Sequence, residues 1–520
     1  MSGAFDVVVV GAGSAGSVVA TRLSEDPSLS VLLIEAGGDD RRADVEQPEL
    51  WQSIQGTDAD WDFASELQPE TGRSYSVPRG KVLGGSGAIN CMAHFRGDRR
   101  DYDGWVAQGA AGWGYAEVRP YFQRSEDVPE GDPAERGTGG PLRPRNTGTA
   151  NPLGEAFAEG AVALGHAFTP DFNAGDTMGV GYAESLIRDG KRETTATAYL
   201  RPAMSRPNLT VVTDALVLDL DIREGRCHGL RYHDRDGVHT VSAGETVLSA
   251  GAIGSPHLLL RSGVGPAAQL ERAGVRPILD LAGVGENLQD HTLLAGIRYR
   301  PARSLGPVDF DDATLFARST TGNHGPDLHL SPMAFDYFMP WQQPDPGSVS
   351  LVVGHMRPKS RGSVRLASAD PEAKPLIDPA FIREHEDLDQ LIAGVELMHA
   401  IVESSFLPRW GGDSDTTRLL ALDRPELERA IADTVSSYFH LVGTCRVGVD
   451  ARSVVDPQLR VHGIDGLRVA DASIMPTSVT VNTNAAAIMI GERAADLVRG
   501  RAHFGAAEDA AFPANTGKDR

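Results

Sequence analysis

The sequence predicts an α/β protein that begins with a strand–helix–strand unit. Residues 5–10 (FDVVVV) are mostly apolar and rich in β-branched valine, as in a buried strand, and residues 30–37 (SVLLIEAG) predict a second one. Between them, a glycine-rich turn at 11–16 (GAGSAG) leads into residues 17–26, where the apolar spacing is helical. These observations indicate a βαβ unit, and therefore a Rossmann-like parallel sheet.

Beyond this unit, residues 208–239 predict short strands with turns. Residues 126–148 are rich in proline, glycine and charge, and indicate a long surface excursion or a boundary. The segment 304–347 mixes aromatic and polar residues without a clean period and is a candidate pocket wall. Residues 501–520 predict a loose tail. Further helices are predicted at 151–165, from 257, at 388–405, at 426–435 and at 484–500.

Composition excludes several classes of function. The 520 residues include 71 acidic and 49 basic side chains, and the net charge of −22 disfavours binding to nucleic acid or anionic lipid. Cys91, Cys227 and Cys445 form no CxxC pair, so neither a disulfide framework nor a thiolate metal cluster is expected. The N-terminal apolar run at 7–10 is too short for a membrane span, and no basic segment precedes it. We expect a cytoplasmic protein without a membrane span.

The first turn has the spacing of a dinucleotide-binding site. Gly11, Gly13 and Gly16 form GxGxxG after the first strand, and Glu35 ends the second strand. The glycines permit the turn, the approach of a pyrophosphate and close packing of helix on strand, while the helix N-terminus attracts the phosphates. Glu35 is placed to accept hydrogen bonds from a ribose diol and would repel a 2′-phosphate, which disfavours NADP. The turn alone leaves FAD and NAD open.

Motifs along nearly the whole chain resemble those of the glucose-methanol-choline (GMC) flavoprotein oxidoreductases. They occur in the order of that family and are PRGKVLGGSGAIN (78–90), GAIGSPHLLLRSGVG (251–265), GVGENLQDH (283–291), RPKSRGSVRL (357–366), HLVGTCRVG (440–448) and VADASIMPTSVTVNTNAAAIMI (469–490). Choline dehydrogenase-like members and aryl-alcohol or hydroxymethylfurfural oxidase-like members are the relatives that the sequence most resembles.

The resemblance implies a two-lobed fold that binds FAD and oxidises an alcohol to a carbonyl compound. The expected FAD-binding domain comprises residues 1–155, 205–300 and 455–500. The expected substrate-binding domain, an α+β domain with an antiparallel sheet, comprises 156–204 and 301–454. The partners implied are a small-molecule alcohol and an electron acceptor, either oxygen or another carrier.

The resemblance also implies a set of FAD-binding residues. Besides the GxGxxG turn and Glu35, it includes the loop along the flavin ring, the position whose backbone meets the adenine, and a late loop that returns to the phosphates. The full set is Gly11, Gly13, Ser14, Ala15, Gly16, Glu35, Ala36, Arg79, Val82, Gly84, Gly85, Asn90, Cys91, Met92, Ala93, Val217, Ala250, Asp471, Ala472, Asn482 and Thr483.

Three features of the sequence qualify this assignment. Some members of the family tether the flavin through a histidine directly before the motif asparagine, but this chain has Ile89 there, which predicts non-covalent FAD. Gly87 replaces a residue that is more often serine. In the second signature, a purely structural interpretation makes Ser255 an N-cap and Pro256 the first residue of a helix that Gly263 ends.

His440 and Asn482 are the predicted catalytic residues, because each lies in a family motif at the place of the catalytic histidine and its hydrogen-bonding partner. Alcohol oxidation removes a hydroxyl proton and an α-hydride from one carbinol, and an imidazole suits the first step because its ordinary pKa lies near working pH. Asn482 is expected to hydrogen-bond the developing alkoxide. A helix starting at Asn484 would point its dipole at the flavin. His94, His291 and His355 receive no role, and no metal motif is present.

The substrate is the least constrained prediction. Tyr438 and Phe439, next to the histidine, indicate an apolar or aromatic pocket, and hence a primary alcohol that is uncharged or aromatic. Choline oxidation is the alternative, with a cation cage built from Asp336, Tyr337, Phe338 and Trp341. A hydroxynitrile lyase-like activity and a non-catalytic flavin protein are further alternatives. A thiol nucleophile at Cys445 is disfavoured.

Overall fold

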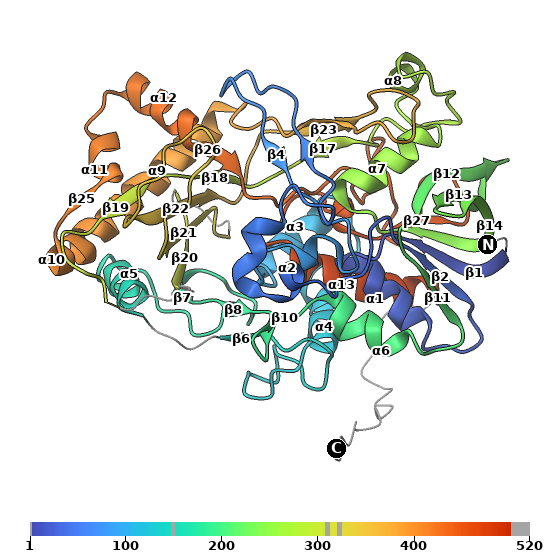
Figure 1. The fold of residues 1–520 in the computed structure, drawn as a ribbon, viewed down its shortest axis with the longest axis horizontal. Coiled ribbons are helices and arrows are strands. Elements are labelled where there is room, and N and C mark those ends of the chain that lie inside the picture. The colour runs from blue at the N-terminus through green and yellow to red at the C-terminus, as the bar shows by residue number, and fades with distance from the viewer. Residues whose placement is uncertain (1–2, 147–150, 307–312, 320–324, 501–520) are drawn as a thin grey trace.

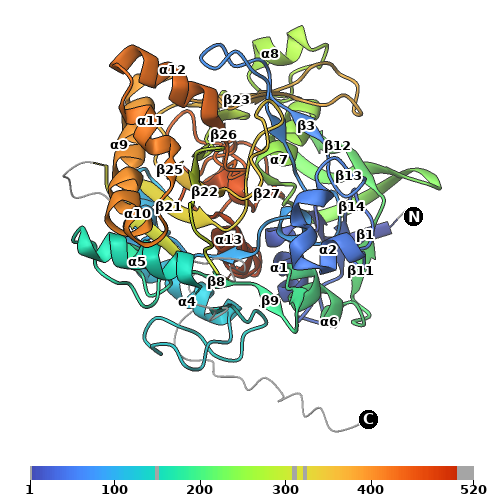
Figure 2. The same ribbon diagram turned by 60° about the vertical axis from the view of Figure 1, so that its left-hand side comes forward.

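The computed structural model of the protein describes residues 3–146, 151–306, 313–319 and 325–500. Two large β-sheets lie on opposite sides of the molecule, right and left in Figure 1, and the C-terminal helix α13 (Asn484–Val498) lies between them. The view in Figure 2 shows the same separation. The predicted tail, 501–520, lies outside the described residues.

The first sheet contains the predicted βαβ unit. Strand β1 pairs in parallel with β2 and β14, and helix α1 (Ser14–Leu23) connects β1 to β2. The last four residues of β1 (7–10) and all of β2 are buried, which explains their unbroken apolar runs. Its seven strands in the described part of the chain are β1 (Gly3–Val10), β2 (Val31–Ile34), β11 (Leu209–Val212), β12 (Leu216–Arg223), β13 (Arg226–Asp234), β14 (Gly237–Leu248) and β27 (Leu467–Val469).

The second sheet is antiparallel in every pairing of its described strands, as predicted. Its eight strands there are β7 (Gly179–Tyr182), β18 (Thr292–Leu294), β19 (Arg298–Arg300), β20 (Ala313–Ala317), β21 (Leu328–Met333), β22 (Val349–His355), β25 (Asp413–Ser414) and β26 (Val435–Ser437). Because β18 and β19 belong to this sheet, the predicted boundary at residue 300 comes too late. The sequence shows no break there, since these strands follow the GVGENLQDH motif directly.

Short strands in small separate sheets and further helices make up the rest of the regular structure in the described residues. The short strands are β3 (Phe63–Ala64), β4 (Ser76–Val77), β5 (Ala93–His94), β6 (Arg145–Asn146), β8 (Glu184–Ser185), β9 (Ile187–Arg188), β10 (Lys191–Arg192), β15 (Val264–Gly265), β16 (Leu279–Asp280), β17 (Glu286–Leu288), β23 (Gly362–Arg365) and β24 (Leu376–Asp378). The remaining α-helices are α2 (Ala43–Glu46), α3 (Arg99–Ala107), α4 (Tyr115–Ser125), α5 (Pro152–Ala163), α6 (Arg201–Ala203), α7 (Gly251–Arg261), α8 (Ala267–Arg272), α9 (His385–Ile401), α10 (Leu407–Trp410), α11 (Asp415–Leu420) and α12 (Arg424–Thr434).

Helix α7 corrects the expectation that Ser255 caps a helix and that Pro256 opens it. The helix begins at Gly251, so Pro256 lies inside it. A proline has no N–H for the carbonyl four residues earlier, which here belongs to Ala252. The Thr444 hydroxyl donates to that carbonyl instead, at 2.6 Å. Gly263, with φ of +80°, ends the helix as predicted.

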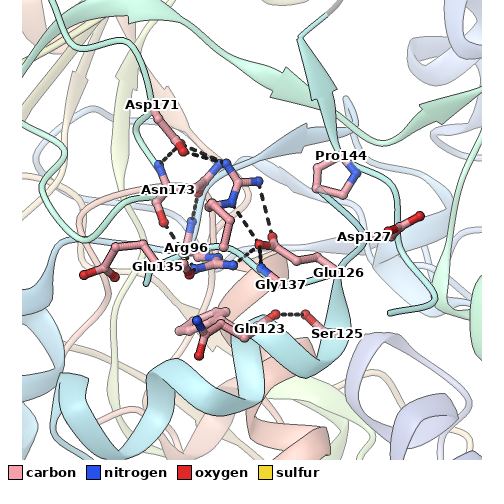
Figure 3. A network of polar contacts seen from close by, with 12 residues as sticks. Arg96, Gln123, Ser125, Glu126, Asp127, Glu135, Gly137, Pro144, Asp171 and Asn173 are labelled. Atoms are coloured by element: carbon pink, nitrogen blue, oxygen red, sulfur yellow. Dashed lines mark hydrogen bonds and ion pairs between the residues drawn. The ribbon is translucent and has the colours of Figure 1, made fainter. Parts of the chain in front are cut away.

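The region 126–148 is more deeply anchored than a surface excursion, as far as it is described. Glu126 is fully buried, and its carboxylate pairs with the guanidinium groups of Arg96 and Arg136 (Figure 3). Arg136 also pairs with Asp171 at 2.9 Å and with Glu184 at 2.8 Å. The prolines and glycines break regular structure, but a buried ion-pair network holds the segment to the protein.

Within the described residues, one continuous helical segment, 385–410, is long and apolar enough by composition to cross a membrane, and half of its apolar 18-residue window is buried inside the protein. Its apolar residues, among them Leu391, Val395 and Met398, belong to the hydrophobic core beneath the second sheet. We interpret the segment as a core helix.

Candidate active site

A cavity of about 690 Å³ is lined by residues of both sheets. At the first sheet, its wall is the predicted glycine turn. Gly11 has φ of +95°, and a Cβ on Gly85 would lie 2.6 Å from the Cα of Gly13. Two loops distant in sequence therefore approach each other to a distance that only glycines allow, leaving a side-chain-free cradle along the cavity. Gly16 serves the packing of α1 on β1 instead, because a Cβ there would meet the carbonyl oxygen of Gly11.

Glu35 lies at the end of β2 and lines the cavity, as predicted. Its two oxygens accept hydrogen bonds from the backbone N–H groups of Ala12 and Gly37, both at 2.8 Å. Burial raises the pKa of Glu35 to about 7, although these N–H groups oppose the rise. Each oxygen keeps a lone pair for a further donor, which is what a ribose diol supplies.

Most of the predicted FAD-binding residues line this one cavity. They are Gly11, Gly13, Ser14, Ala15, Glu35, Ala36, Arg79, Gly85, Asn90, Cys91, Ala93, Val217, Ala250, Asp471, Ala472, Asn482 and Thr483. Gly16, Val82, Gly84 and Met92 do not line it; Val82 and Met92 are buried instead. A family motif thus includes residues that shape a loop as well as residues that contact a ligand.

The late loop and the last helix close the same side of the cavity. The Asp471 carboxylate accepts from the backbone N–H of Gly251 at 2.9 Å and from the Ser255 hydroxyl at 2.5 Å, so it fixes the start of α7. Helix α13 begins at Asn484, as predicted, and Asn484 accepts from the Ser14 hydroxyl at 2.6 Å. The N-terminus of α13 therefore lies at the cavity, where its dipole favours negative charge.

His440 and Asn482 meet at the cavity wall. Asn482 Nδ2 lies 3.1 Å from His440 Nε2, and both side chains are more than nine-tenths buried. Asn482 Oδ1 is buried without a hydrogen-bond partner in the described residues. Burial lowers the pKa of His440 well below its usual value, and the nearby His291, Arg79 and His329 lower it further. His440 is therefore a neutral imidazole that can accept a proton.

The backbone before His440 is held in an unusual conformation. Phe439 has φ of +64°, in the left-handed region. Its N–H donates to the Ser437 hydroxyl at 2.8 Å, and its carbonyl accepts from Arg79 at 2.6 Å. The next N–H, that of His440, donates to Asp290 at 2.8 Å. These contacts fix where the imidazole projects into the cavity.

Sequence reasoning gave His291 no role, yet its Nδ1 lies 2.9 Å from His440 Nδ1. Burial lowers the pKa of His291 to about 3, so this ring is neutral as well. Asp290 and His291 both belong to the GVGENLQDH motif, so this motif is the sequence feature that could have pointed to them. What the sequence could not show is that β18 brings this motif beside β26 and His440.

Comparison with known proteins identifies the family. Family models described as GMC oxidoreductase match residues 5–293 and 358–491. The chain is a GMC oxidoreductase. It is 38% identical to the oxygen-dependent choline dehydrogenase of Brucella anthropi, over 95% of this chain and 96% of that protein. Among solved structures, pyridoxine 4-oxidase from Mesorbium loti matches with a TM-score of 0.90 and 35% identity, over 96% of this chain and 100% of the other.

A formate oxidase structure, 24% identical, shares the fold with a TM-score of 0.88 over 96% of this chain and 99% of the other. The structural matches confirm the predicted GMC fold. The family models, the choline dehydrogenase and pyridoxine 4-oxidase also confirm that the chain is an FAD-dependent oxidoreductase that acts on CH–OH donors. The cavity of this GMC oxidoreductase also fits FAD on its own geometry. The glycine cradle can accept a pyrophosphate, and Glu35 has lone pairs for a ribose. Asn482 Oδ1, which has no partner among the described residues, can accept a hydrogen bond from a donor on the flavin.

The wall beside His440 is apolar and aromatic. Tyr438 and Phe439 line the cavity, and Tyr438 packs in a cluster with other cavity residues: Trp51, Leu293, Met333, Phe335 and Tyr337. The predicted cation cage is not assembled. Asp336 pairs with Arg298 at 2.6 Å, Phe338 is 38% exposed and Trp341 packs against Tyr75, so only Tyr337 of the four lines the cavity.

Proposed function

We propose that this GMC oxidoreductase oxidises an uncharged primary alcohol, preferably an aromatic one, to the aldehyde. The observation that carries the proposal is the His440–Asn482 pair, which opens onto an aromatic wall. In the described part of the chain, the carboxylates that line the cavity are Glu35, Asp471 and Glu372. Glu35 and Asp471 accept hydrogen bonds from backbone N–H groups in the part of the cavity that is predicted to bind the nucleotide. Glu372 belongs to the same part, because the carbonyl of its neighbour Pro371 accepts a hydrogen bond from Arg261, which also donates to the carbonyl of Val217.

His440, Asn482 and the N-terminus of α13 each contribute to one part of the alcohol oxidation. His440 Nε2 accepts the proton of the substrate hydroxyl, while Asn482 holds the same oxygen as negative charge develops on it. Bound FAD would supply the acceptor for the hydride that leaves the carbinol carbon. The loss of one proton and one hydride converts the CH₂–OH group to an aldehyde. The N-terminus of α13 stabilises negative charge at this side of the cavity.

Choline is the second candidate, because the relative from Brucella anthropi is an oxygen-dependent choline dehydrogenase. The aromatic wall offers cation–π contacts to a quaternary ammonium group. The absence of a carboxylate beside His440 among the described lining residues places choline after a neutral alcohol.

An anaerobic substrate panel tests the proposal. The FAD-loaded protein is mixed with benzyl alcohol, a linear primary alcohol, choline or mandelonitrile, and the flavin absorbance is followed. Rapid bleaching by benzyl alcohol, faster than by choline, is the expected result. Faster bleaching by choline would overturn the substrate class, and release of benzaldehyde and cyanide from mandelonitrile without bleaching would indicate a lyase. Bleaching by none of them would indicate a non-catalytic flavin protein.

We further propose that the FAD is non-covalent, because Ile89 lines the cavity and carries no nucleophile. Acid precipitation should then release the flavin into the supernatant. Admitting air to the reduced protein distinguishes oxygen from another carrier as the electron acceptor. A cytoplasmic location is consistent with three cysteines that form no disulfide, and cell fractionation would test it.

A further inference from the structure

A chain of three polar side chains runs through the wall of the cavity, apart from the His440–Asn482 pair. Thr314 on β20, His329 on β21 and Tyr438 after β26 all line the cavity. The Thr314 hydroxyl hydrogen-bonds His329 Nε2, and His329 Nδ1 lies 2.7 Å from the Tyr438 hydroxyl. The rest of this wall is largely apolar, with Ser331 on β21 as a further polar residue that lines the cavity.

Neutral His329 makes this chain adaptable. Burial lowers the pKa of His329 to about 3, so the ring carries one N–H and one lone pair at working pH. In one tautomer Nε2–H donates to Thr314 and Nδ1 accepts from the Tyr438 O–H, which leaves a lone pair on the tyrosine oxygen. In the other tautomer Nδ1–H donates to that oxygen, and the tyrosine O–H can donate elsewhere. Tyr438 can therefore serve a partner as acceptor or as donor.

The surrounding residues fix the tyrosine ring. It stacks on the His440 ring with centroids 4.7 Å apart and an interplanar angle of 22°. The tyrosine ring also lies close to Gly354, where an added Cβ would be 2.8 Å from Tyr438 Cε2. Gly354 is the residue that pairs with His329 in the β21–β22 register. His329 itself stacks on Phe316 at 4.6 Å. The stacked rings of His440 and Tyr438 therefore face the same cavity in a fixed relative orientation.

We propose that the Thr314–His329–Tyr438 chain is a specificity element that binds a second hydrogen-bonding group on the substrate. The substrate class that fits is a primary alcohol on an aromatic ring bearing a hydroxyl group or a ring nitrogen. This inference rests on the proposed function, because it assumes that the carbinol is held at His440 and Asn482. The aromatic ring would pack on the apolar wall while Tyr438 contacts the ring substituent.

The experiment compares benzyl alcohol with 3-hydroxybenzyl alcohol, 4-hydroxybenzyl alcohol and the pyridylmethanols on the FAD-loaded enzyme. We expect kcat/KM to be about 10- to 100-fold higher for the best ring-substituted alcohol than for benzyl alcohol. The Tyr438→Phe variant should reduce this ratio to about one, mainly through KM. Thr314→Val, which keeps the shape but releases His329 Nε2, should lower the ratio about threefold or more.

Tyr299→Phe is the matched control, because it removes a buried tyrosine hydroxyl from β19 of the same sheet at a position that does not line the cavity. It should keep the wild-type ratio. A ratio near one in the wild type, or a high ratio that persists in Tyr438→Phe, would overturn the inference while leaving alcohol oxidation intact. Failure of every alcohol to bleach the flavin would overturn the proposed function, and this inference with it.

Discussion

His291 Nδ1 and His440 Nδ1 lie 2.9 Å apart, so two neutral imidazoles share one hydrogen bond. Because Asn482 Nδ2 faces His440 Nε2, the lone pair of His440 is at Nε2 and its proton at Nδ1. His291 must then present its own lone pair at Nδ1. His291 is therefore a positioning residue, because its hydrogen bond holds His440 in the tautomer that accepts a proton on the cavity side.

Replacing the base tests the centre of this arrangement. His440→Ala should lower the rate of flavin reduction by roughly 10²- to 10⁴-fold while FAD stays bound, because proton transfer loses its acceptor and the nucleotide end is untouched. Anaerobic stopped-flow with benzyl alcohol gives the rate, and the flavin spectrum gives occupancy. His385→Ala, on the protein surface, is the control. Near wild-type reduction by His440→Ala would remove His440 from the mechanism.

The pH profile should reflect the lowered pKa of His440. A base is active when it is deprotonated, so a pKa below the usual value keeps His440 active to lower pH. We expect kcat/KM to change little between about pH 6 and pH 8 and to fall only below that range. A profile that rises tenfold with an inflection near the ordinary histidine pKa of about 6.5 would contradict the environment described for His440.

His291 is expected to act through His440. His291→Leu removes the acceptor at Nδ1 and should lower kcat by about 10- to 100-fold with a smaller change in KM. His291→Asn can still accept a hydrogen bond and should recover part of the loss. Rate and KM for benzyl alcohol are measured for both, with thermal unfolding as the check on folding. Equal losses in the two variants would indicate packing alone.

The sequence was most informative where a motif carries backbone geometry. The GxGxxG turn, Glu35 and the start of α13 are found as predicted, because glycine spacing and helix periodicity are local properties. His329 and Thr314 could not be predicted, since their meeting depends on strand pairing within an aperiodic segment. The position of Pro256 in the helix was predicted wrongly for a related reason. The Thr444 hydroxyl donates to the Ala252 carbonyl that Pro256 leaves without an N–H, and Thr444 is 192 residues from Ala252 in the chain.

Glu35 should make FAD binding depend on pH. Its pKa is raised to about 7 by burial, so a growing fraction is protonated below that pH. A ribose diol donates best to the carboxylate, so binding favours the ionised form. The Kd for FAD should therefore fall as pH rises towards 7 and level off above it. Fluorescence titration of the apoprotein with FAD measures this directly.

Glu35→Gln should raise the Kd at pH 8 by about 10- to 100-fold and flatten the pH dependence, because a neutral amide replaces a charged acceptor. Glu49→Gln, an exposed residue, controls for the change in net charge. An unchanged slope in Glu35→Gln would show that another group titrates.

The buried network around Glu126 should govern stability rather than activity. Glu126 accepts from Arg96, from Arg136 and from the backbone N–H of Gly137, so removing its charge leaves two buried guanidinium groups less well compensated (Figure 3). We expect Glu126→Gln to cost about 3 kcal/mol or more, seen as a lower thermal unfolding midpoint of the holoprotein.

Glu130→Gln is the matched control, because Glu130 is 66% exposed and pairs with Arg145 only at 3.7 Å. Such an exposed pair contributes about 0–1 kcal/mol, so its midpoint should stay near that of the wild type. Equal midpoints for Glu126→Gln and Glu130→Gln would show that the network does not anchor the segment. A difference between them would establish that burial of the charges, and not their number, gives this region its stability.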